Sequence, residues 1–244
     1  MKIKQVLSLT LAFMLTGMSI ACSQSNTYRV PGSNTQLVIE LSDITKSKVE
    51  AIVNAANPQL AAGGGVCGAI FKAAGLSKLQ NACNEYPAVE GVRCPTGQAR
   101  VTDSFDLKAR GIQYIIHAVG PDCRIITDQA QQNDLLKNAY INSLILAESL
   151  QIKSIAFPFI SSAIYAFPKN RAARIAIDSA CQYIQEHNMT ALESIHFVLF
   201  LQEDFDLFCK IMNEKGQLIP NKVEKIQQLS KFQQFINYLK SYIA

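Results

Sequence analysis

The chain has 244 residues, of which 49% are hydrophobic and 17% are charged. It can therefore bury a full core, which excludes disordered, collagen-like and low-complexity classes. Its formal net charge of +4 comes from the ends: of the 23 basic residues, two lie in 1–21 and four in 220–244, which leaves 17 beside 18 acidic residues in 22–219. Because proteins that gather phosphate backbones are usually basic across the folded domain, this distribution argues against a nucleic-acid partner.

Residues 1–21 have the pattern of an export signal. Lys2 and Lys4 precede an uncharged, largely apolar run over 6–21, which ends in small residues. These three regions in this order are typical of a secretory signal peptide. The alternative is a transmembrane anchor, but the run is short for a span and polar residues interrupt it. We therefore expect an exported protein, either periplasmic, secreted or anchored to a membrane.

Cys22 follows the expected cleavage site directly. This resembles the lipobox of bacterial lipoproteins, whose cysteine becomes lipid-modified, although Ser19 stands where that motif prefers Leu or another aliphatic residue. A lipid anchor at Cys22 and simple cleavage both stay open, and such an anchor is the only membrane attachment that we expect. Residues 22–36 are expected to form a linker.

Strand and helix patterns alternate along residues 37–213. Short apolar runs predict strands over residues 36–40, 51–55, 98–102, 113–119, 154–160 and 195–201. Apolar residues at helical spacing predict helices over residues 66–74, 133–151, 170–187 and 204–213. This alternation favours a layered α/β domain.

Residues 214–244 are predicted to form a helical extension. Lys215, Gly216 and Pro220 mark a break, and residues 221–243 then place apolar side chains mainly three and four apart. This spacing predicts an amphipathic helix. The helix could dock on its own domain or bind a partner or a membrane surface.

Six cysteines remain after Cys22: Cys67, Cys83, Cys94, Cys123, Cys181 and Cys209. They form no C-x-x-C pair, and the three histidines lack ligand spacing, so neither a metal site nor a cofactor is expected. In an exported protein an even number of cysteines permits disulfides, and Cys83 and Cys94 bracket a short polar loop. The sequence leaves both disulfides and buried free thiols open.

Two loops follow predicted buried strands, where α/β folds bind their ligands. The first loop contains Asn54, Asn57 and the glycines at 63–65, and the second covers residues 161–166. Successive glycines before a helix let backbone N–H groups approach an anion, although a flexible turn has the same composition. Asparagine side chains both donate and accept hydrogen bonds, as sugar hydroxyls require.

These loops belong to an ordered series of motifs. The series is Asp43-Ile44-Thr45, Val53-Asn54-Ala55-Ala56-Asn57, Gly63-Gly64-Gly65-Val66, Lys72-Ala73-Ala74-Gly75, Cys94-Pro95-Thr96-Gly97, Tyr114-Ile115-Ile116-His117-Ala118-Val119-Gly120-Pro121 and Ser161-Ser162-Ala163-Ile164-Tyr165-Ala166-Phe167-Pro168. In order and spacing it resembles macrodomains of the MacroD type over residues 37–213. The resemblance implies a three-layer α/β/α fold with a mixed central sheet that binds ADP-ribose or an ADP-ribosylated protein.

The resemblance also implies roles for single residues. Asp43, with Ile44 beside it, matches the acid that contacts the adenine amino group. The substrate-binding residues of the first loop would be Asn54, Gly63, Gly64, Gly65, Val66 and Cys67, and those of the second loop Ser161, Ser162, Ala163, Ile164 and Tyr165. Tyr165 matches the aromatic side chain beside the distal ribose. Asn57 matches the asparagine that positions this ribose and, in hydrolytic members, the reacting centre.

The implied reaction is the attack of water on ADP-ribosyl esters, either on acidic side chains or in O-acetyl-ADP-ribose. Cys67 stands where hydrolytic members usually carry the Asp that orients or activates this water, and a neutral thiol is no base near pH 7. Two hypotheses therefore remain: an ester hydrolase with Asn57 as its catalytic residue, and a non-catalytic module that binds ADP-ribose.

Two further features bear on the site. Ala163 and Ala166 occupy positions where the family usually has glycine, and each would cost about 1 kcal/mol if its φ were positive. His117 lies inside an apolar strand, so we interpret it as a core histidine rather than a general base.

Overall fold

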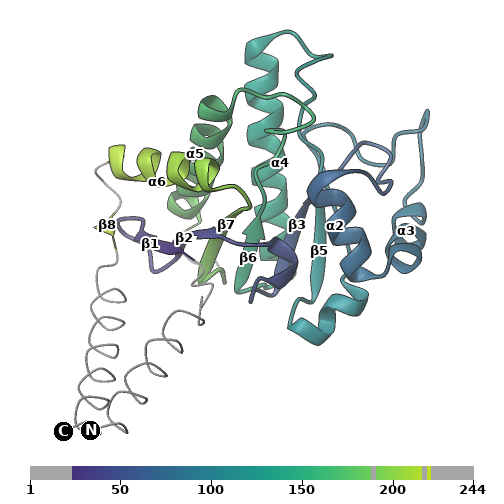
Figure 1. Cartoon of the computed structure of the whole chain (residues 1–244), viewed down its shortest axis with the longest axis horizontal. Helices are drawn as coiled ribbons and strands as arrows, with labels where there is room; N and C mark the ends of the chain where they lie inside the picture. Colours follow the sequence, from purple (N-terminus) through teal and green to yellow (C-terminus); the bar gives the residue numbers. More distant parts are fainter. Residues whose placement is uncertain (1–23, 188–190, 216–218, 221–244) are drawn as a thin grey trace, which may run out of the picture.

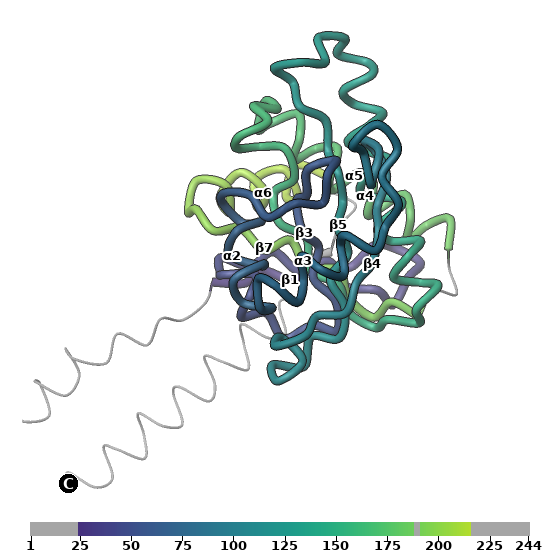
Figure 2. Tube along the Cα trace, turned by 90° about the vertical axis from the view of Figure 1, so that its right-hand side faces the viewer, coloured from purple at the N-terminus to yellow at the C-terminus, as the bar shows by residue number. Residues whose placement is uncertain are grey.

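The computed structural model describes residues 24–187, 191–215 and 219–220. In this part of the chain one eight-stranded sheet lies between two layers of helices (Figures 1 and 2). The strand order is β4-β5-β3-β6-β7-β2-β1-β8. The strands are β1 (Ser25–Arg29), β2 (Gln36–Leu41), β3 (Ala51–Ala55), β4 (Ala99–Asp103), β5 (Tyr114–Ala118), β6 (Ser154–Phe157), β7 (Ser194–Leu199) and β8 (Ile219–Pro220).

The five central strands β5, β3, β6, β7 and β2 run parallel to one another. The strands outside them are antiparallel to their neighbours: β4 pairs with β5, β1 with β2, and β8 with β1. Because parallel strands end at the same edge of a sheet, the loops that follow the five central strands lie in a row along this carboxyl edge.

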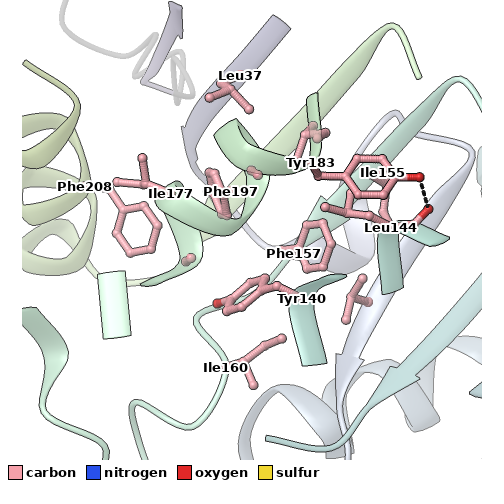
Figure 3. Close-up of a cluster of buried hydrophobic side chains, with 14 of the residues drawn as sticks. Leu37, Tyr140, Leu144, Ile155, Phe157, Ile160, Ile177, Tyr183, Phe197 and Phe208 are labelled. Carbon is pink, nitrogen blue, oxygen red and sulfur yellow. Dashed lines mark hydrogen bonds between the residues drawn. The ribbon is translucent and has the colours of Figure 1, made fainter. Parts of the chain in front are cut away.

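Helices α4 (Gln129–Ser149), α5 (Lys169–Glu186) and α6 (Gln202–Glu214) cover one face of the sheet. Alternate strand residues such as Leu37, Ile155 and Phe197 pack against them (Figure 3). Aromatic rings fill the centre of this layer, where the Tyr140 and Phe157 ring centroids lie 5.2 Å apart. The burial of so much apolar surface is the main force that holds these helices on the sheet.

Helices α2 (Gly65–Ala74) and α3 (Leu76–Asn84) cover the other face, together with the 3₁₀ turns η1 (Ile44–Lys46) and η2 (Phe105–Arg110). Their core is smaller and contains Ile52, Ile70 and Phe71. The two cores with the sheet between them confirm the predicted three-layer α/β/α fold with a mixed sheet.

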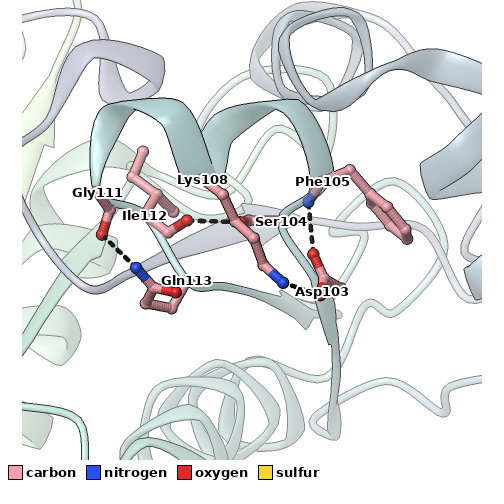
Figure 4. Close-up of polar contacts among 7 residues, drawn as sticks. All are labelled: Asp103, Ser104, Phe105, Lys108, Gly111, Ile112 and Gln113. Carbon is pink, nitrogen blue, oxygen red and sulfur yellow. Dashed lines mark hydrogen bonds and ion pairs between the residues drawn. The ribbon is translucent and has the colours of Figure 1, made fainter.

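Polar contacts close the connection from β4 to β5 (Figure 4). The Asp103 carboxylate accepts the Phe105 N–H at 2.7 Å and also binds Lys108. The Ser104 hydroxyl donates to the carbonyl of Ile112. These bonds satisfy the backbone groups of a turn that joins two antiparallel strands.

The predicted linker over residues 22–36 is wrong in part, since Ser25–Arg29 form strand β1 at the side of the sheet. Tyr28 of this strand is buried against the large core. Helix α3 was not predicted either, because only Leu79 and Cys83 of its nine residues are buried and give a weak periodic signal.

The predicted signal peptide over residues 1–21, Cys22 and the predicted helix over residues 221–243 lie outside the described residues. Within the predicted extension over 214–244, Glu214 still belongs to α6, and Ile219–Pro220 form the short strand β8 rather than a helix.

All six cysteines from Cys67 onward are free thiols in the described structure. Cys83 and Cys94, which bracket the short loop, are both buried and form no disulfide. Among the described residues, no three His, Cys, Asp or Glu side chains gather as a metal ion would need. No helix in the described ranges has the length and apolar character to cross a membrane.

Candidate functional site

A cavity of about 240 Å³ opens at the carboxyl edge of the sheet. It lies between the loops that follow β3, β5 and β6, and fifteen residues line it: Ala55, Ala56, Asn57, Gly63, Gly64, Gly65, Val66, Cys67, Gly120, Phe159, Ile160, Ser161, Ala163, Ile164 and Tyr165. None of these lining residues carries a charged side chain. An anionic ligand in this cavity would therefore have to be bound by backbone groups and helix termini.

Asn57 shapes the first loop. Its Nδ2 donates to the carbonyl of Ala61 at 2.8 Å, and its Oδ1 accepts the Ala61 N–H at 2.9 Å. The amide thus closes a turn directly before the glycines. An asparagine amide has two N–H donors, so one donor remains for a group inside the cavity.

The glycines bring the backbone of this loop to the start of α2. Gly64 caps the helix without a side-chain hydrogen bond, and the N–H groups of Gly65, Val66 and Cys67, which line the cavity, have no partner in the described part of the chain. At Gly68 a Cβ atom would lie 2.5 Å from the carbonyl oxygen of Gly63. This close approach fixes the loop against the first turn of the helix.

The second loop turns its carbonyl groups inward to the protein. The carbonyl of Ser161 accepts the Phe167 N–H at 3.0 Å, that of Ala163 accepts the Ala166 N–H at 3.0 Å, and that of Tyr165 accepts the Cys123 N–H at 2.9 Å. Within the described structure the N–H groups of Ala163, Ile164 and Tyr165 have no partner. The two loops therefore offer unpaired backbone donors from opposite sides of one cavity, which is an arrangement suited to a phosphate anion.

The condition for strain in the second loop is met at one of the two alanines. Ala166 has a φ of 53° and Ser161 one of 61°, whereas Ala163 is not among the residues with positive φ. The cost of an alanine at positive φ therefore applies at Ala166 and not at Ala163. Ser161 was not expected to be strained. Its hydroxyl is buried without a partner against Gly120.

Cys67 is 5% exposed at the floor of the cavity. Burial raises the pKa of its thiol above the usual range, and hydrogen bonds from the Asn54 side chain and the Gly63 backbone lower it only in part. The sulfur lies 3.6 Å from Asn54 Nδ2 and 3.8 Å from the Ala61 carbonyl oxygen. This thiol is thus neutral near pH 7 and does not serve as a base.

Asn54 and His117 lie behind Cys67 in the core. Both are fully buried, and Asn54 Nδ2 is 3.1 Å from His117 Nδ1. The other ring nitrogen, Nε2, is 3.0 Å from the Thr102 hydroxyl. Burial lowers the pKa of His117 to about 3, so it is a neutral core histidine, as predicted. Asn54 was expected to contact the ligand, but it is not among the lining residues and instead positions Cys67.

Asp43 and Ile44 follow β2 on the same edge of the sheet, but neither lines the cavity. Asp43 Oδ1 accepts from the Thr45 N–H at 3.0 Å and from its hydroxyl at 2.8 Å, which caps η1. Its Oδ2 lies 3.7 Å from Lys46 Nζ. Ile44 is buried in the smaller core. Ser162 is also absent from the lining, since its hydroxyl donates to the Phe159 carbonyl.

Sequence reasoning missed several residues at this edge. Gly120, Phe159 and Ile160 line the cavity, and Phe200 and Leu201 are exposed where β7 ends. Each directly follows a buried parallel strand. That position was the signal that could have identified them.

The geometry agrees with comparisons to known proteins. The family model of the Macro domain matches residues 53–176. A macro domain-containing protein of Listeria monocytogenes is 41% identical over 180 residues, which cover 74% of this chain and 98% of that protein. The chain belongs to the macrodomain family.

Two other comparisons connect this macrodomain with named ligands and activities. The O-acetyl-ADP-ribose deacetylase of Escherichia coli K12 is 38% identical over 75% of this chain and 98% of its own length. The macrodomain of Oceanobacillus iheyensis, solved with ADP, has a TM-score of 0.70 and 36% identity, and the match covers 79% of this chain and 98% of that one.

A more distant macrodomain, that of Trypanosoma brucei in complex with ADP-ribose, has a TM-score of 0.62 and 30% identity. The match covers 72% of this chain and 68% of that chain. This macrodomain therefore shares its fold with proteins that bind adenine nucleotides carrying a diphosphate.

Proposed function

We propose that this macrodomain binds ADP-ribosyl groups in the cavity at the carboxyl edge of the sheet and hydrolyses ADP-ribosyl esters. The substrates would be mono-ADP-ribosylated acidic side chains or O-acetyl-ADP-ribose. The observation that carries the proposal is the double set of unpaired backbone donors, from the Gly64–Val66 segment and from residues 163–165, around a cavity without charged walls.

A diphosphate carries about two negative charges, and backbone N–H groups at a helix start can meet them without lysine or arginine. The adenine would extend along the row of loops towards Asp43, and the distal ribose would lie beside Asn57 and Tyr165. Exposed Phe200 lies between these ends, where an adenine ring could stack on it.

For hydrolysis, Asn57 would hold the distal ribose with its remaining amide donor, so that a water molecule can attack the ester carbonyl carbon. The bond from this carbon to the ribose oxygen then breaks, which frees the carboxylic acid and the ribose hydroxyl. Orientation of this kind can contribute several kcal/mol to a rate. Cys67 contributes no base, so the proton of the attacking water would pass to the substrate's own phosphate. The relatives named O-acetyl-ADP-ribose deacetylase support this activity at the level of the family.

The experiment measures ADP-ribose binding by calorimetry and ester turnover on O-acetyl-ADP-ribose and on glutamate-ADP-ribosylated protein. The parent protein is compared with Cys67→Asp and with Cys67→Ser, a control that changes the size of the side chain little. We expect slow turnover by the parent and by Cys67→Ser, and faster turnover by Cys67→Asp. Turnover by Cys67→Asp alone would overturn the hydrolase proposal, and the absence of ADP-ribose binding would overturn the whole function.

A second function, ADP-ribose binding without turnover, has one observation in its favour. The cavity-facing thiol of Cys67 has a raised pKa and is bonded into the loop, so nothing at this position activates water. If the parent binds ADP-ribose but leaves both esters intact, this second function holds.

Asn57→Ala separates the two roles of the asparagine. We expect turnover to fall by roughly 100-fold through lost orientation, whereas ADP-ribose affinity falls less. Single-turnover rates and calorimetry on the same variant measure both. An unchanged rate would refute the catalytic role of Asn57.

We also propose that residues 1–21 direct export and that Cys22 begins the mature protein. Support comes from the sequence pattern alone. Mass spectrometry of the chain expressed in a bacterial host should find Cys22 at the amino terminus, with added lipid mass if it is anchored. A product that retains Met1 would overturn the proposal.

A further inference from the structure

A partly buried guanidinium without an acidic partner lies beside the second loop. Arg171 is in the first turn of α5, and its Nε and Nη1 atoms are buried without a hydrogen-bond partner. Its Nη2 donates to Gln132 Oε1. No carboxylate of the described residues forms an ion pair with it. Burial of an uncompensated charge is costly, so this arrangement calls for an anion.

Arg171 also lies at the end of its helix where a positive charge is disfavoured. The amino end of a helix carries a partial positive charge, which disfavours cations in the first turn. Lys169 in the same turn binds Glu203 and Asp204. Arg124, which lies above Tyr165, is bonded to Asp122. Of these three cations beside the second loop, Arg171 alone has no acid to neutralise it.

The guanidinium contacts two residues, Phe167 and Cys123, that are bonded to the backbone lining the cavity. Its Cζ atom is 4.6 Å from the centroid of the Phe167 ring, and the Phe167 N–H is bonded to the Ser161 carbonyl. Burial raises the pKa of Cys123, and the nearby guanidinium lowers it in part, through its charge and a side-chain hydrogen bond to this thiol. The Cys123 N–H is bonded to the Tyr165 carbonyl. The charge therefore lies one residue layer behind both ends of the second loop.

We propose that Arg171 is a positioning residue that supplies the counter-charge for the diphosphate of a bound ADP-ribosyl group. It acts through the loop over residues 161–167 and does not touch the ligand. This inference rests on the proposed function. A partly buried positive charge attracts an anion across the loop more strongly than a fully exposed one, because solvent screens it less. The ligand then neutralises a charge that the free protein leaves unpaired.

The test compares Arg171→Gln with Arg174→Gln. Arg174 lies one turn further along the same helix, exposed and paired with Glu214, so its loss changes the net charge equally. Calorimetry measures binding of ADP-ribose, AMP and adenosine to each protein. We expect Arg171→Gln to weaken ADP-ribose binding roughly tenfold and AMP binding less. Its adenosine affinity, and every affinity of Arg174→Gln, should stay within about twofold of the parent.

A structural role for Arg171 would give a different pattern. If Arg171→Gln weakened adenosine as much as ADP-ribose, or if ADP-ribose affinity were unchanged, the inference would be overturned. If this variant fails to fold, Arg171→Lys tests the inference instead. Because lysine keeps the positive charge, this variant should bind ADP-ribose with an affinity within about threefold of the parent. A tenfold loss in folded Arg171→Lys would contradict the inference. If the parent binds no ADP-ribose, the proposed function itself fails.

Discussion

His117 and Cys67 are ionisable side chains that burial keeps neutral, and they are joined through the Asn54 amide. A neutral His117 accepts the Asn54 N–H at Nδ1, so its own proton resides on Nε2 and faces Thr102. This fixed tautomer holds Asn54, and Asn54 holds the sulfur at the floor of the cavity. Protonation of the histidine would break the first bond in this series.

His117 should make the protein sensitive to acid. Its pKa in the folded state is about 3, whereas it is about 6.5 in an unfolded chain. Between these values only the unfolded state binds the proton. The free energy of unfolding should therefore fall as the pH drops below about 6.5, by up to about 1.4 kcal/mol per pH unit. Urea unfolding at several pH values between 7 and 4 measures this slope.

His117→Gln should flatten that slope, since it removes the titrating group. His187→Gln, which replaces a histidine outside the buried core, serves as the matched control and should keep the slope of the parent. An equal slope in His117→Gln and the parent would show that other groups cause the acid sensitivity.

Ala166 and Ala163 should respond in opposite ways to replacement by glycine. Ala166→Gly relieves a positive φ, so the free energy of unfolding should rise by roughly 0.5 kcal/mol after the greater chain entropy of glycine is subtracted. Ala163→Gly relieves nothing and should lower it by a similar amount. Thermal or urea unfolding measures both, and equal effects would contradict the strain at Ala166.

The sequence could predict those site residues that lie together in one continuous stretch of the chain. Gly63, Gly64 and Gly65 stand together before a helix, a composition typical of an anion-binding loop or a flexible turn, and all three line the cavity. Asn54 was misplaced, because its position beside His117 depends on the register of β3 with β5. Arg171 could not be identified at all, since its burial arises from the packing of α5 behind the second loop.

At the scale of elements, Gly120 joins the loops that follow β5 and β6. A Cβ atom there would overlap Ser161 Oγ and lie 2.6 Å from Ile160 Cγ2. Gly120→Ala should therefore push the loops apart, lower the free energy of unfolding by roughly 1–3 kcal/mol and weaken ADP-ribose binding.

The added change Ser161→Gly should restore part of the lost stability, because it removes the overlapping hydroxyl and suits the positive φ at that residue. Unfolding and binding are measured on the single and double variants. Full stability in Gly120→Ala would show that the two loops do not constrain each other.

The predicted elements were most accurate at the centre of the sheet. Strands buried on both faces read as continuous apolar runs, and Ala51–Ala55 was predicted with its observed bounds. The strand predicted over 154–160 ends at Phe157, because Pro158 lacks the N–H that a ladder needs. Helix α4 begins four residues before its prediction, since its polar first turn depends on the Asp128 cap and not on apolar spacing. The side strand β1 has no continuous run of apolar residues and was therefore not predicted.

At the scale of the whole molecule, the charged side chains lie away from the cavity in which we propose that ADP-ribose binds. The cavity walls carry no charged side chain, and Arg171, the cation that we propose to act on the ligand, has its Nε and Nη1 atoms buried. Salt screens exposed charges far more than buried ones. ADP-ribose affinity should therefore change by less than about threefold between 50 and 500 mM salt, as calorimetry can measure. A steep loss of affinity with salt would indicate exposed lysines or arginines at the site.

The pairing of β1 with β2 has a consequence for the orientation of an anchored protein. The Gln24 carbonyl accepts the Leu41 N–H at 2.9 Å, so the chain enters the fold beside the end of β2, two residues before Asp43. Two residues span at most about 7 Å. With a lipid on Cys22, one of the two outcomes that the sequence pattern leaves open, the Asp43 end of the row of loops would be held close to the bilayer. The protein would then sample ADP-ribosyl groups borne at the membrane surface ahead of those in free solution.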